Sequence, residues 1–469
     1  MGMGKARGTA RLRPAAALAG LLALAACAPA LQTPIASAVP PLPDGFVGGS
    51  LPGEVESRWW TSFGDPQLDA LVDRALANNP SIDAAAARLA QARALARQAG
   101  ADRYPSLAAR LDASESGVEG PAQGRDLAEL AVDVSWEVDL WGRIGAQARG
   151  ARTDALASEA DLAALRQLVA AETARTYFAV IEAREQIALS TRVLETYDEL
   201  IRQIGLRTQA GLVPQNYNAL VIADRESAQA GLAFRQEDYT RLVRQLDVLL
   251  GDYPAGEGIT ADVLPDLPPL PATGLPAQLL ARRPDVRSAA LGVESAGYRV
   301  DAARAEFLPQ LVLNGSTGGT AGGLAGLFDN GLGFWSVAGR LLQPVFEGGR
   351  LRARLDQRQG ERDEAIARYG DTVLQALLEV ETALAVTPDI AARHTAFARS
   401  AEAAEQAVTV STLRYQAGIE AFDNVLESQQ RALAARSATL SAARAKLDNR
   451  VALHLALAGD LPNNGPSPD

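Results

Sequence analysis

The stretch that decides the fold is Glu129-Leu130-Ala131-Val132-Asp133-Val134-Ser135-Trp136-Glu137-Val138-Asp139-Leu140. Because successive side chains of a strand point to opposite faces, this alternation predicts a β-strand with one apolar and one acidic face. A strand of about ten residues suits a tilted crossing of a bilayer. A half-buried strand of a water-exposed sheet has the same pattern, so the segment alone leaves both readings open. If the strand is a membrane strand, its lipid-facing residues are Leu130, Val132, Val134, Trp136, Val138 and Leu140.

The segments around this strand predict two hairpins. The partner strand of the first hairpin is expected at residues 106–114, with a loop containing Gly and Pro at 116–124. The second hairpin is expected from strands at 310–316 and 334–345, around the Gly-rich stretch 318–333. The chain is therefore written twice. Pro80 and Pro284 are 204 residues apart, as are Pro105 and Pro309, and two similar halves imply a pseudo-symmetric object.

Long helices flank each hairpin. Residues 81–103 are Ala-rich and helical in spacing, and Tyr104-Pro105 should end that helix. Helices are then expected at 144–209 and 218–250 in the first half, and at 351–415 and 422–457 in the second. The outgoing helix of the first half would span on the order of 100 Å. Pro388 should kink or interrupt its counterpart. Each half thus reads helix, strand, strand, helix, helix.

The sequence divides into six segments. They are a signal peptide (1–26), a Pro- and Gly-rich linker (27–64), a first repeat (65–250, hairpin about 105–140), a Pro-rich connector (251–276), a second repeat (277–460, hairpin about 309–345) and a tail (461–469).

The N-terminus carries an export signal. Basic residues from Lys5 to Arg13 precede an apolar run that is too short to span a bilayer. Leu24-Ala25-Ala26-Cys27 follows and resembles a lipobox, in which the cysteine is acylated, with palmitate among the expected groups, and becomes the first mature residue. Cys27 is the only cysteine of the chain, so an internal disulfide is excluded.

Composition argues against several functional classes. The formal charge of −11 argues against nucleic-acid binding, because an acidic chain repels the phosphate backbone. His394 and His454 are the only histidines and form no metal-binding pair, and neither a phosphate-binding loop nor a nucleophile elbow is present. We therefore expect no enzyme, no metal and no cofactor.

Four strands cannot close a barrel, because the smallest closed membrane barrels have about eight. Open strand edges are not tolerated in hydrocarbon, so a membrane hairpin pair requires further copies of the chain. A lipid-anchored periplasmic coiled-coil scaffold is the alternative, and it needs no membrane hairpins.

Several motifs recur in order and carry a family resemblance. They are the Asn/Arg-Pro helix starts at Pro80 and Pro284, the strand entries at Pro105 and Pro309, the strand exits Trp141-Gly142-Arg143 and Gly348-Gly349-Arg350, and the Leu-Arg-x-Gln-Ala-Gly turns ending at Gly211 and Gly418. With them the chain resembles the TolC-type outer-membrane efflux factors, in particular the lipoprotein branch similar to OprM and the NodT-like proteins.

The resemblance implies a fold and partners. The fold would be mainly α with a membrane β-barrel segment: a homotrimer with a twelve-stranded barrel continued by a long α-helical barrel. Such proteins are passive exit ducts in the outer membrane of Gram-negative bacteria. They dock to a periplasmic adaptor, the membrane fusion protein, and to an inner-membrane pump, often of the resistance-nodulation-division type.

The resemblance also points to functional residues at the two helix-to-helix turns. The turns would form the periplasmic tip that meets the adaptor, with docking candidates Leu206, Arg207, Ala210, Gly211, Leu212, Val213, Leu413, Arg414, Tyr415, Ala417, Gly418 and Ile419. Glu420, Asp423 and Glu427 would form a ring of acids that narrows the pore and favours cations; an ordinary solvated helix face is an equal alternative. Tyr415, Arg414 and Glu427 are candidates for links between chains. The first half departs from this pattern, with Pro214, Asn216, Tyr217 and Asn218 at its turn.

Overall fold

The computed structural model describes residues 39–49, 51, 53, 56–116, 125–329 and 332–457. The predicted signal peptide, Cys27 and the predicted tail 461–469 lie outside these residues. The elements are η3 (Trp59–Phe63), α2 (Pro66–Asn78), α3 (Pro80–Ala101), β1 (Ser106–Ser116), β2 (Arg125–Val138), α4 (Arg143–Gln209), α5 (Asn216–Leu249), α6 (Pro276–Arg282), α7 (Pro284–Ala305), β3 (Gln310–Ala321), α8 (Gly326–Asp329), β4 (Leu332–Leu342), α9 (Arg350–Gln416) and α10 (Phe422–Leu457).

The predicted duplication is confirmed by this order. Helices α4 and α9 have 67 residues each, and α3 and α7 have 22 each. A short helix precedes each half, α2 before α3 and α6 before α7, which the sequence reading did not anticipate. No helix within the described residues combines the length and apolarity that a bilayer crossing demands.

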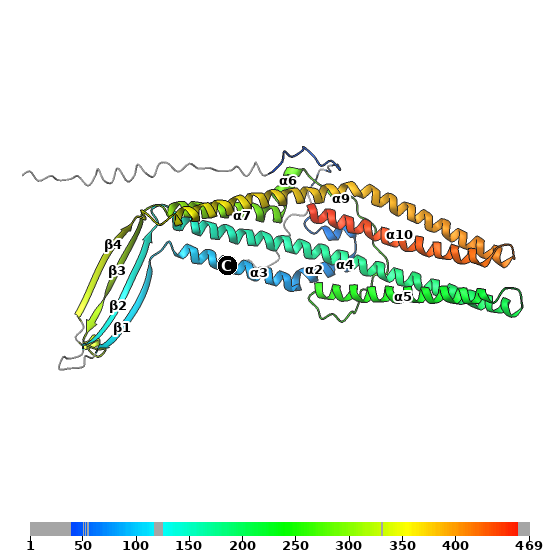
Figure 1. The fold of residues 1–469 in the computed structure, drawn as a ribbon, viewed down its shortest axis with the longest axis horizontal. Helices are drawn as coiled ribbons and strands as arrows, with labels where there is room; N and C mark the ends of the chain where they lie inside the picture. Colours follow the sequence, from blue (N-terminus) through cyan, green and yellow to red (C-terminus); the bar gives the residue numbers. More distant parts are fainter. Residues whose placement is uncertain are drawn as a thin grey trace, which may run out of the picture. The chain divides into compact units, whose positions relative to one another are not determined.

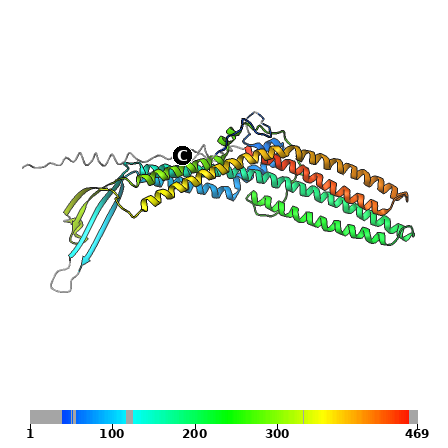
Figure 2. The same cartoon turned by 45° about the horizontal axis from the view of Figure 1, so that its top comes forward.

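The described chain forms two compact units. One consists of Ala96–Ala151 and Glu294–Ile366 and holds the strands with the adjoining helix ends. The other consists of Pro41–Leu95, Arg152–Val293 and the chain from Ala367 onward, and holds the helix hairpins. Figures 1 and 2 show the four strands side by side in the first unit, and the α4–α5 and α9–α10 hairpins in the second.

The four strands form one antiparallel sheet in the order β1-β2-β3-β4. Strand β2 is central and pairs with β1 of its own half and with β3 of the other half. Strands β1 and β4 each have a single neighbour within the described residues, so the sheet has two open edges.

The register gives the sheet two chemically distinct faces. Leu130 lies opposite Leu111, and Val134 opposite Leu107, so the apolar positions of β1 and β2 share a face. On the other face Arg110 of β1 pairs with Glu129 (2.7 Å) and Asp133 (3.2 Å) of β2. The structure therefore confirms an amphipathic sheet with an apolar and a polar side.

Strand β2 ends two residues earlier than predicted, so Leu140 is not a strand residue. The carboxylate of Asp139 accepts hydrogen bonds from the backbone N–H groups of Ile144 (3.0 Å) and Gly145 (2.7 Å). Asp139 thus satisfies orphan donors in the first turn of α4. This capping role takes the chain out of the sheet after Val138, and the assignment of Leu140 to the membrane strand was wrong.

The second hairpin also differs from the prediction. Strand β3 continues to Ala321, so the first part of the Gly-rich stretch is strand and not loop. A Cβ at Gly318 would lie 2.1 Å from the carbonyl oxygen of Leu130, so the close approach of β2 requires glycine there. Strand β4 ends at Leu342, two residues before Pro344, and Val345 lies outside it.

The linker prediction was wrong for residues 59–63. Trp59, Trp60 and Phe63 are buried, and they pack in the largest core cluster with α2, α4 and α5 residues. The Trp59 indole N–H donates to Gln167 of α4 (3.1 Å), and the Tyr177 hydroxyl donates to Asp65 (2.6 Å). The segment before α2 is therefore part of the folded helical unit, because its aromatic side chains complete the core around α4.

One hydrogen bond occurs at equivalent places in both halves, so the duplication extends to side-chain contacts. The amide of Asn79 donates to the carbonyl of Leu249 at the end of α5 (2.8 Å). The guanidinium of Arg283, 204 residues later, donates to the carbonyl of Ala456 near the end of α10 (3.0 Å). Each half thus ties the residue before its second helix to the end of its own last helix, where carbonyls lack helical partners.

Helix α9 runs through Pro388 without interruption, so of the two predicted effects of this proline, a kink or an interruption, the interruption is excluded. Proline removes one backbone donor. The amide of Asn449 on α10 supplies hydrogen bonds beside it, to the carbonyl of Ala383 (3.0 Å) and the hydroxyl of Thr387 (3.0 Å). Hydrogen bonds from α10 therefore stabilise α9 beside Pro388.

Candidate functional site

The two turns that join α4 to α5 and α9 to α10 have the same backbone geometry. Gly211 and Gly418 have φ values of 66° and 71°, in the left-handed region that favours glycine. Leu212 N–H donates to the Arg207 carbonyl (2.9 Å), and Ile419 N–H donates to the Arg414 carbonyl (2.9 Å). Both helices thus end in the six-to-one hydrogen bond of a Schellman motif, and the repeated sequence motif has a structural cause.

The two turns pack on a shared apolar core, called here the tip core. It contains buried residues from all four helices: Tyr197, Leu200, Ile204, Val221, Tyr415, Phe422, Val425 and Leu426. The rings of Tyr415 and Phe422 lie 5.1 Å apart. The tip core holds the turns of the two halves together at one end of the helical unit.

Arg207 connects the first turn directly to the second. Its guanidinium donates to the carbonyls of Tyr415 (3.4 Å) and Gln416 (3.3 Å) at the end of α9, and its central carbon lies 4.7 Å from the centre of the Tyr415 ring. A cation beside a helix C-terminus interacts favourably with the carbonyls exposed there. We call this contact the Arg207 clasp.

The docking candidates separate into exposed and inward-facing residues. Four large apolar side chains are exposed at matching positions: Leu206 (57%), Leu212 (73%), Leu413 (61%) and Ile419 (68%). The small residues Ala210, Gly211, Ala417 and Gly418 at the turns are also exposed. Tyr415 is buried and Val213 packs partly against the tip core, so these two candidates face inward.

The acidic candidates have partners within the chain. Glu420 lies 3.2 Å from Arg414 and accepts a hydrogen bond from Asn424 (3.0 Å). Glu427 pairs with Arg431 one turn further along α10 (2.5 Å). The predicted interchain links through Tyr415, Arg414 and Glu427 therefore compete with contacts inside one chain. Asp423 is exposed on the first turn of α10.

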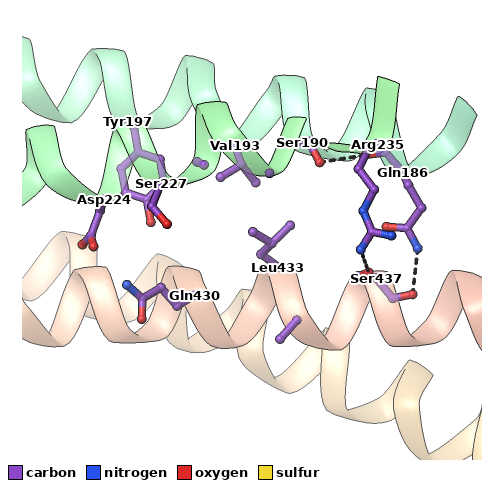
Figure 3. Close-up of a pocket in the computed structure, with 13 residues that line it drawn as sticks. Gln186, Ser190, Val193, Tyr197, Asp224, Ser227, Arg235, Gln430, Leu433 and Ser437 are labelled. Carbon is purple, nitrogen blue, oxygen red and sulfur yellow. Dashed lines mark hydrogen bonds between the residues drawn. The ribbon is translucent and has the colours of Figure 1, made fainter. Parts of the chain in front are cut away.

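A polar groove of about 500 Å³, which the sequence reading missed, adjoins the tip core. In Figure 3, Tyr197, Asp224 and Gln430 lie at one end, while Gln186 and Arg235 meet Ser437 at the other. Small residues of α5 (Ser227, Ala228 and Gly231) line it and leave space between α5 and α10. Their spacing of one helical turn is the signal that was available in the sequence.

Partly buried charged residues connect α4 to α10 beyond this groove. Glu182 accepts a hydrogen bond from Ser441 (2.6 Å) and lies 2.9 Å from Arg444. Asp448 lies 3.8 Å from the same guanidinium nitrogen of Arg444. Burial raises the pKa of Asp448 to about 6, although Arg444 and Arg175 oppose that shift.

The histidines do not form a site. His454 is buried and stacks on Trp59, with ring centres 5.4 Å apart. Burial lowers the pKa of His454 to about 4, and Arg450 adds to the effect. His394 lies elsewhere, on α9. Within the described residues, no group of three or more His, Cys, Asp or Glu side chains is arranged to hold a metal.

Duplicated halves, each with one strand hairpin and one long helix hairpin ending in an apolar turn, define a class of bacterial outer-membrane channel proteins. The chain belongs to the outer membrane efflux protein family, which matches residues 71–252 and 275–459. The two matched segments coincide with the two halves of the fold.

Relatives match the chain over most of its length. The pyoverdine export outer membrane protein OpmQ of Pseudomonas aeruginosa is 32% identical over 86% of this chain and 87% of its own. The outer membrane protein OprJ of the same species is 30% identical over 87% and 88%. The cation efflux system protein CusC of Escherichia coli K12 is 28% identical over 86% and 88%.

Solved structures agree with the fold. The outer-membrane channel OprN has a TM-score of 0.82 and 28% identity, covering 93% of this chain and 99% of that one. The outer membrane channel CmeC of Campylobacter jejuni has a TM-score of 0.86 at 23% identity, covering 93% and 96%, and supports the fold alone.

Proposed function

We propose that this protein is the outer-membrane exit duct of a tripartite efflux system, passively conducting substrates that an inner-membrane pump and a periplasmic adaptor deliver. The observation that carries the proposal is the four-stranded amphipathic sheet with two open edges, in a chain of the outer membrane efflux protein family. An open edge presents unpaired backbone groups, which hydrocarbon does not tolerate. Other copies of the chain must pair with β1 and β4.

Three copies give the assembly that we propose. Twelve strands exceed the minimum of about eight for a closed membrane barrel. The polar face with Arg110, Glu129 and Asp133 would then line water, and the apolar face with Leu130 and Val134 would meet lipid. The helix hairpins of the three copies would continue the conduit as an α-helical barrel in the periplasm.

The exposed apolar residues of the turns are the proposed adaptor-docking surface. Leu206, Leu212, Leu413 and Ile419 occupy equivalent positions and stay exposed although each turn is well ordered by its hydrogen bonds. Apolar side chains held exposed on a rigid turn are a typical protein-binding feature. The serine variant of Leu212 should weaken adaptor binding about tenfold, while the serine variant of Leu168, half exposed in the middle of α4, should not.

The gate that we propose involves Glu420, Asp423 and Glu427. Three copies would bring nine such carboxylates to one end of the conduit, and rings of acids favour cations. Because Glu420 and Glu427 are paired with arginines, Asp423 should contribute most of the field. Asp423→Asn should therefore lower the cation selectivity of the pore more than Glu420→Gln or Glu427→Gln does.

The lipid anchor is also a proposal. Acylation of Cys27 would fix the chain to the outer membrane in addition to its strands. Labelling with an alkyne analogue of palmitate tests it, because Cys27 is the single cysteine and its serine variant should lose the label.

We propose that the pump selects the cargo. Relatives named for pyoverdine export, cation efflux and solvent efflux match this chain at similar identity, 32%, 28% and 28%. The sequence identity between this chain and its relatives therefore does not depend on the chemistry of the cargo for which each relative is named.

The decisive experiment separates the duct from a lipid-anchored coiled-coil scaffold. Purified protein should migrate as a heat-resistant trimer and form pores in planar bilayers. A nitroxide at position 130 should be accessible to oxygen dissolved in lipid, whereas one at position 129 should be accessible to a water-soluble nickel chelate. A monomer with both positions in water would support the scaffold and refute the duct.

A further inference from the structure

Figure 1 shows where strand β4 passes into helix α9 within the strand-bearing unit. A charged cavity lies at this passage. Its volume is about 380 Å³, and its charged lining consists of Arg143, Glu306, Glu347, Arg350 and Arg354. A cavity of this size accommodates a small polar group. Nothing in the proposed conduction path requires it.

The cavity walls are fixed by hydrogen bonds from both strand-to-helix joints. The side chain of Gln343, just after β4, donates to the Phe307 carbonyl (2.9 Å). The indole N–H of Trp141, just after β2, donates to the Pro309 carbonyl (2.7 Å). Both joints are therefore anchored to the turn between α7 and β3, and the cavity is a built feature of the fold.

The charged side chains around the cavity are arranged in pairs. Arg354 pairs with Glu306 (2.8 Å), Arg143 pairs with Glu137 (2.7 Å), and Arg350 pairs with Glu347. A guanidinium has five donors and a carboxylate has about four acceptor positions, so each group keeps capacity for a ligand. Two of the lining arginines, Arg350 and Arg354, stand beside the two lining glutamates, Glu347 and Glu306. A site that presents both signs complements a group that itself carries both signs better than it complements a simple anion.

Apolar side chains lie directly beside these charges. Val345 and Phe346, in the segment between β4 and α9, are 92% and 90% exposed. Leu341, on the apolar face of the sheet, is also exposed. A ligand with a charged head and apolar tails would meet both surfaces at once.

From this juxtaposition we propose that the cavity binds the headgroup of phosphatidylethanolamine, with the phosphate on Arg350 and Arg354 and the ammonium on Glu306 and Glu347. The acyl chains lie over Val345 and Phe346. Arginine matches phosphate geometry, and an ammonium, unlike a quaternary amine, donates hydrogen bonds to carboxylates. The proposal rests on the outer-membrane placement of the proposed function, because the helical side of the sheet then faces the periplasmic leaflet.

The test is native mass spectrometry of the full-length, delipidated protein, titrated with phosphatidylethanolamine, phosphatidylcholine or phosphatidylglycerol of identical acyl chains. Phosphatidylethanolamine should bind at least about fivefold more tightly than the other two. The double variant Arg350→Gln/Arg354→Gln should weaken its binding by a similar factor. Arg352→Gln is the matched control, since Arg352 lies on the same helix turn but does not line the cavity, and it should bind as the wild type does.

A second variant tests the ammonium contact. Glu306→Gln/Glu347→Gln should abolish the preference over phosphatidylcholine while keeping affinity for phosphate-bearing lipids. Equal binding of all three lipids by the wild type, or unchanged binding by both double variants, overturns the proposal. So does a double variant that dissociates the oligomer without changing lipid binding, which would make a second copy the occupant. Pore conductance is recorded on the same sample, so that failure of the lipid site can be told from failure of the proposed function. A protein that conducts but shows no headgroup preference refutes the lipid site alone.

Discussion

Arg207→Gln should raise the population of the locally open second turn, although it changes no residue of that turn. The Arg207 clasp is the direct polar contact from the end of α4 to the end of α9, through the carbonyls of Tyr415 and Gln416 and the Tyr415 ring. Glutamine keeps a polar side chain of helical preference but loses the charge, the reach and the interaction with the ring.

The magnitude follows from the geometry. A guanidinium over an aromatic face contributes about 0.5–1 kcal/mol at an exposed site. Hydrogen bonds from charged donors contribute about 1.5–3 kcal/mol, but donor distances of 3.3 and 3.4 Å are long, so about 1 kcal/mol for the two together is reasonable. The total is about 2 kcal/mol, which corresponds to about a 30-fold rise in the population of locally open turn.

Hydrogen exchange of the turn amides measures this population. The amides of Ala417, Gly418 and Ile419 donate to carbonyls of α9, so they exchange only when the turn opens. Their exchange should accelerate about 30-fold in Arg207→Gln. Arg202→Gln is the control, because Arg202 pairs with Glu199 on its own exposed helix face, and such pairs contribute less than about 1 kcal/mol. Equal acceleration in both variants, or none in Arg207→Gln, would refute a clasp between the turns.

Gly418→Ala should destabilise the folded protein by about 1 kcal/mol, because alanine is strained at φ of 71°. Gly205→Ala, in the interior of α4, should instead stabilise it by up to about 1 kcal/mol. Denaturant unfolding measures both, and free energies of unfolding that change in the same direction for the two variants would contradict this. Asp448→Asn should remove a pH dependence, since a carboxyl whose folded pKa is raised to about 6 from 3.8 destabilises the fold progressively as pH rises from about 4 to 6. The unfolding free energies of variant and wild type should then agree near pH 4 and differ by up to about 2 kcal/mol at pH 7.5, and a constant difference at all pH values would be incompatible with the linkage. Trp59→Ala should cost about 3–5 kcal/mol, whereas the exposed Val47→Ala should cost less than about 0.5 kcal/mol; similar melting temperatures for both would show that residues 59–63 are not part of the core.

The elements of the fold were largely predictable because their signals are local. Alternation of apolar and acidic residues defined β2, and proline or glycine marks most helix ends. Helix α10 was predicted at 422–457 and is observed over the same residues. The boundaries that failed, at the ends of β2 and β3, depend on a capping carboxylate and on the approach of a neighbouring strand, and neither is visible in a window of sequence.

The contacts that complete the core were not predictable. Trp59 lies in a Pro- and Gly-rich neighbourhood that reads as linker, and its partner Gln167 is 108 residues away. The same holds for the tip. Tyr415 and Leu413 both belong to the repeated turn motif, yet Tyr415 is buried and Leu413 is exposed. Only packing between helices decides this, because Phe422 of α10 and Arg207 of α4 meet the Tyr415 ring.

One difference between the two turns explains why the clasp runs in a single direction. Arg207 and Arg414 are equivalent, 207 residues apart, but Arg207 reaches the other turn while Arg414 pairs with Glu420 of its own. The residue equivalent to Glu420 in the first turn is Val213, which packs partly into the tip core and offers no charge. Because the first turn lacks a local carboxylate, its arginine is available for the carbonyls of α9. The duplicated backbone therefore supplies two equal turns, and the difference between Val213 and Glu420 favours the observed direction of the clasp.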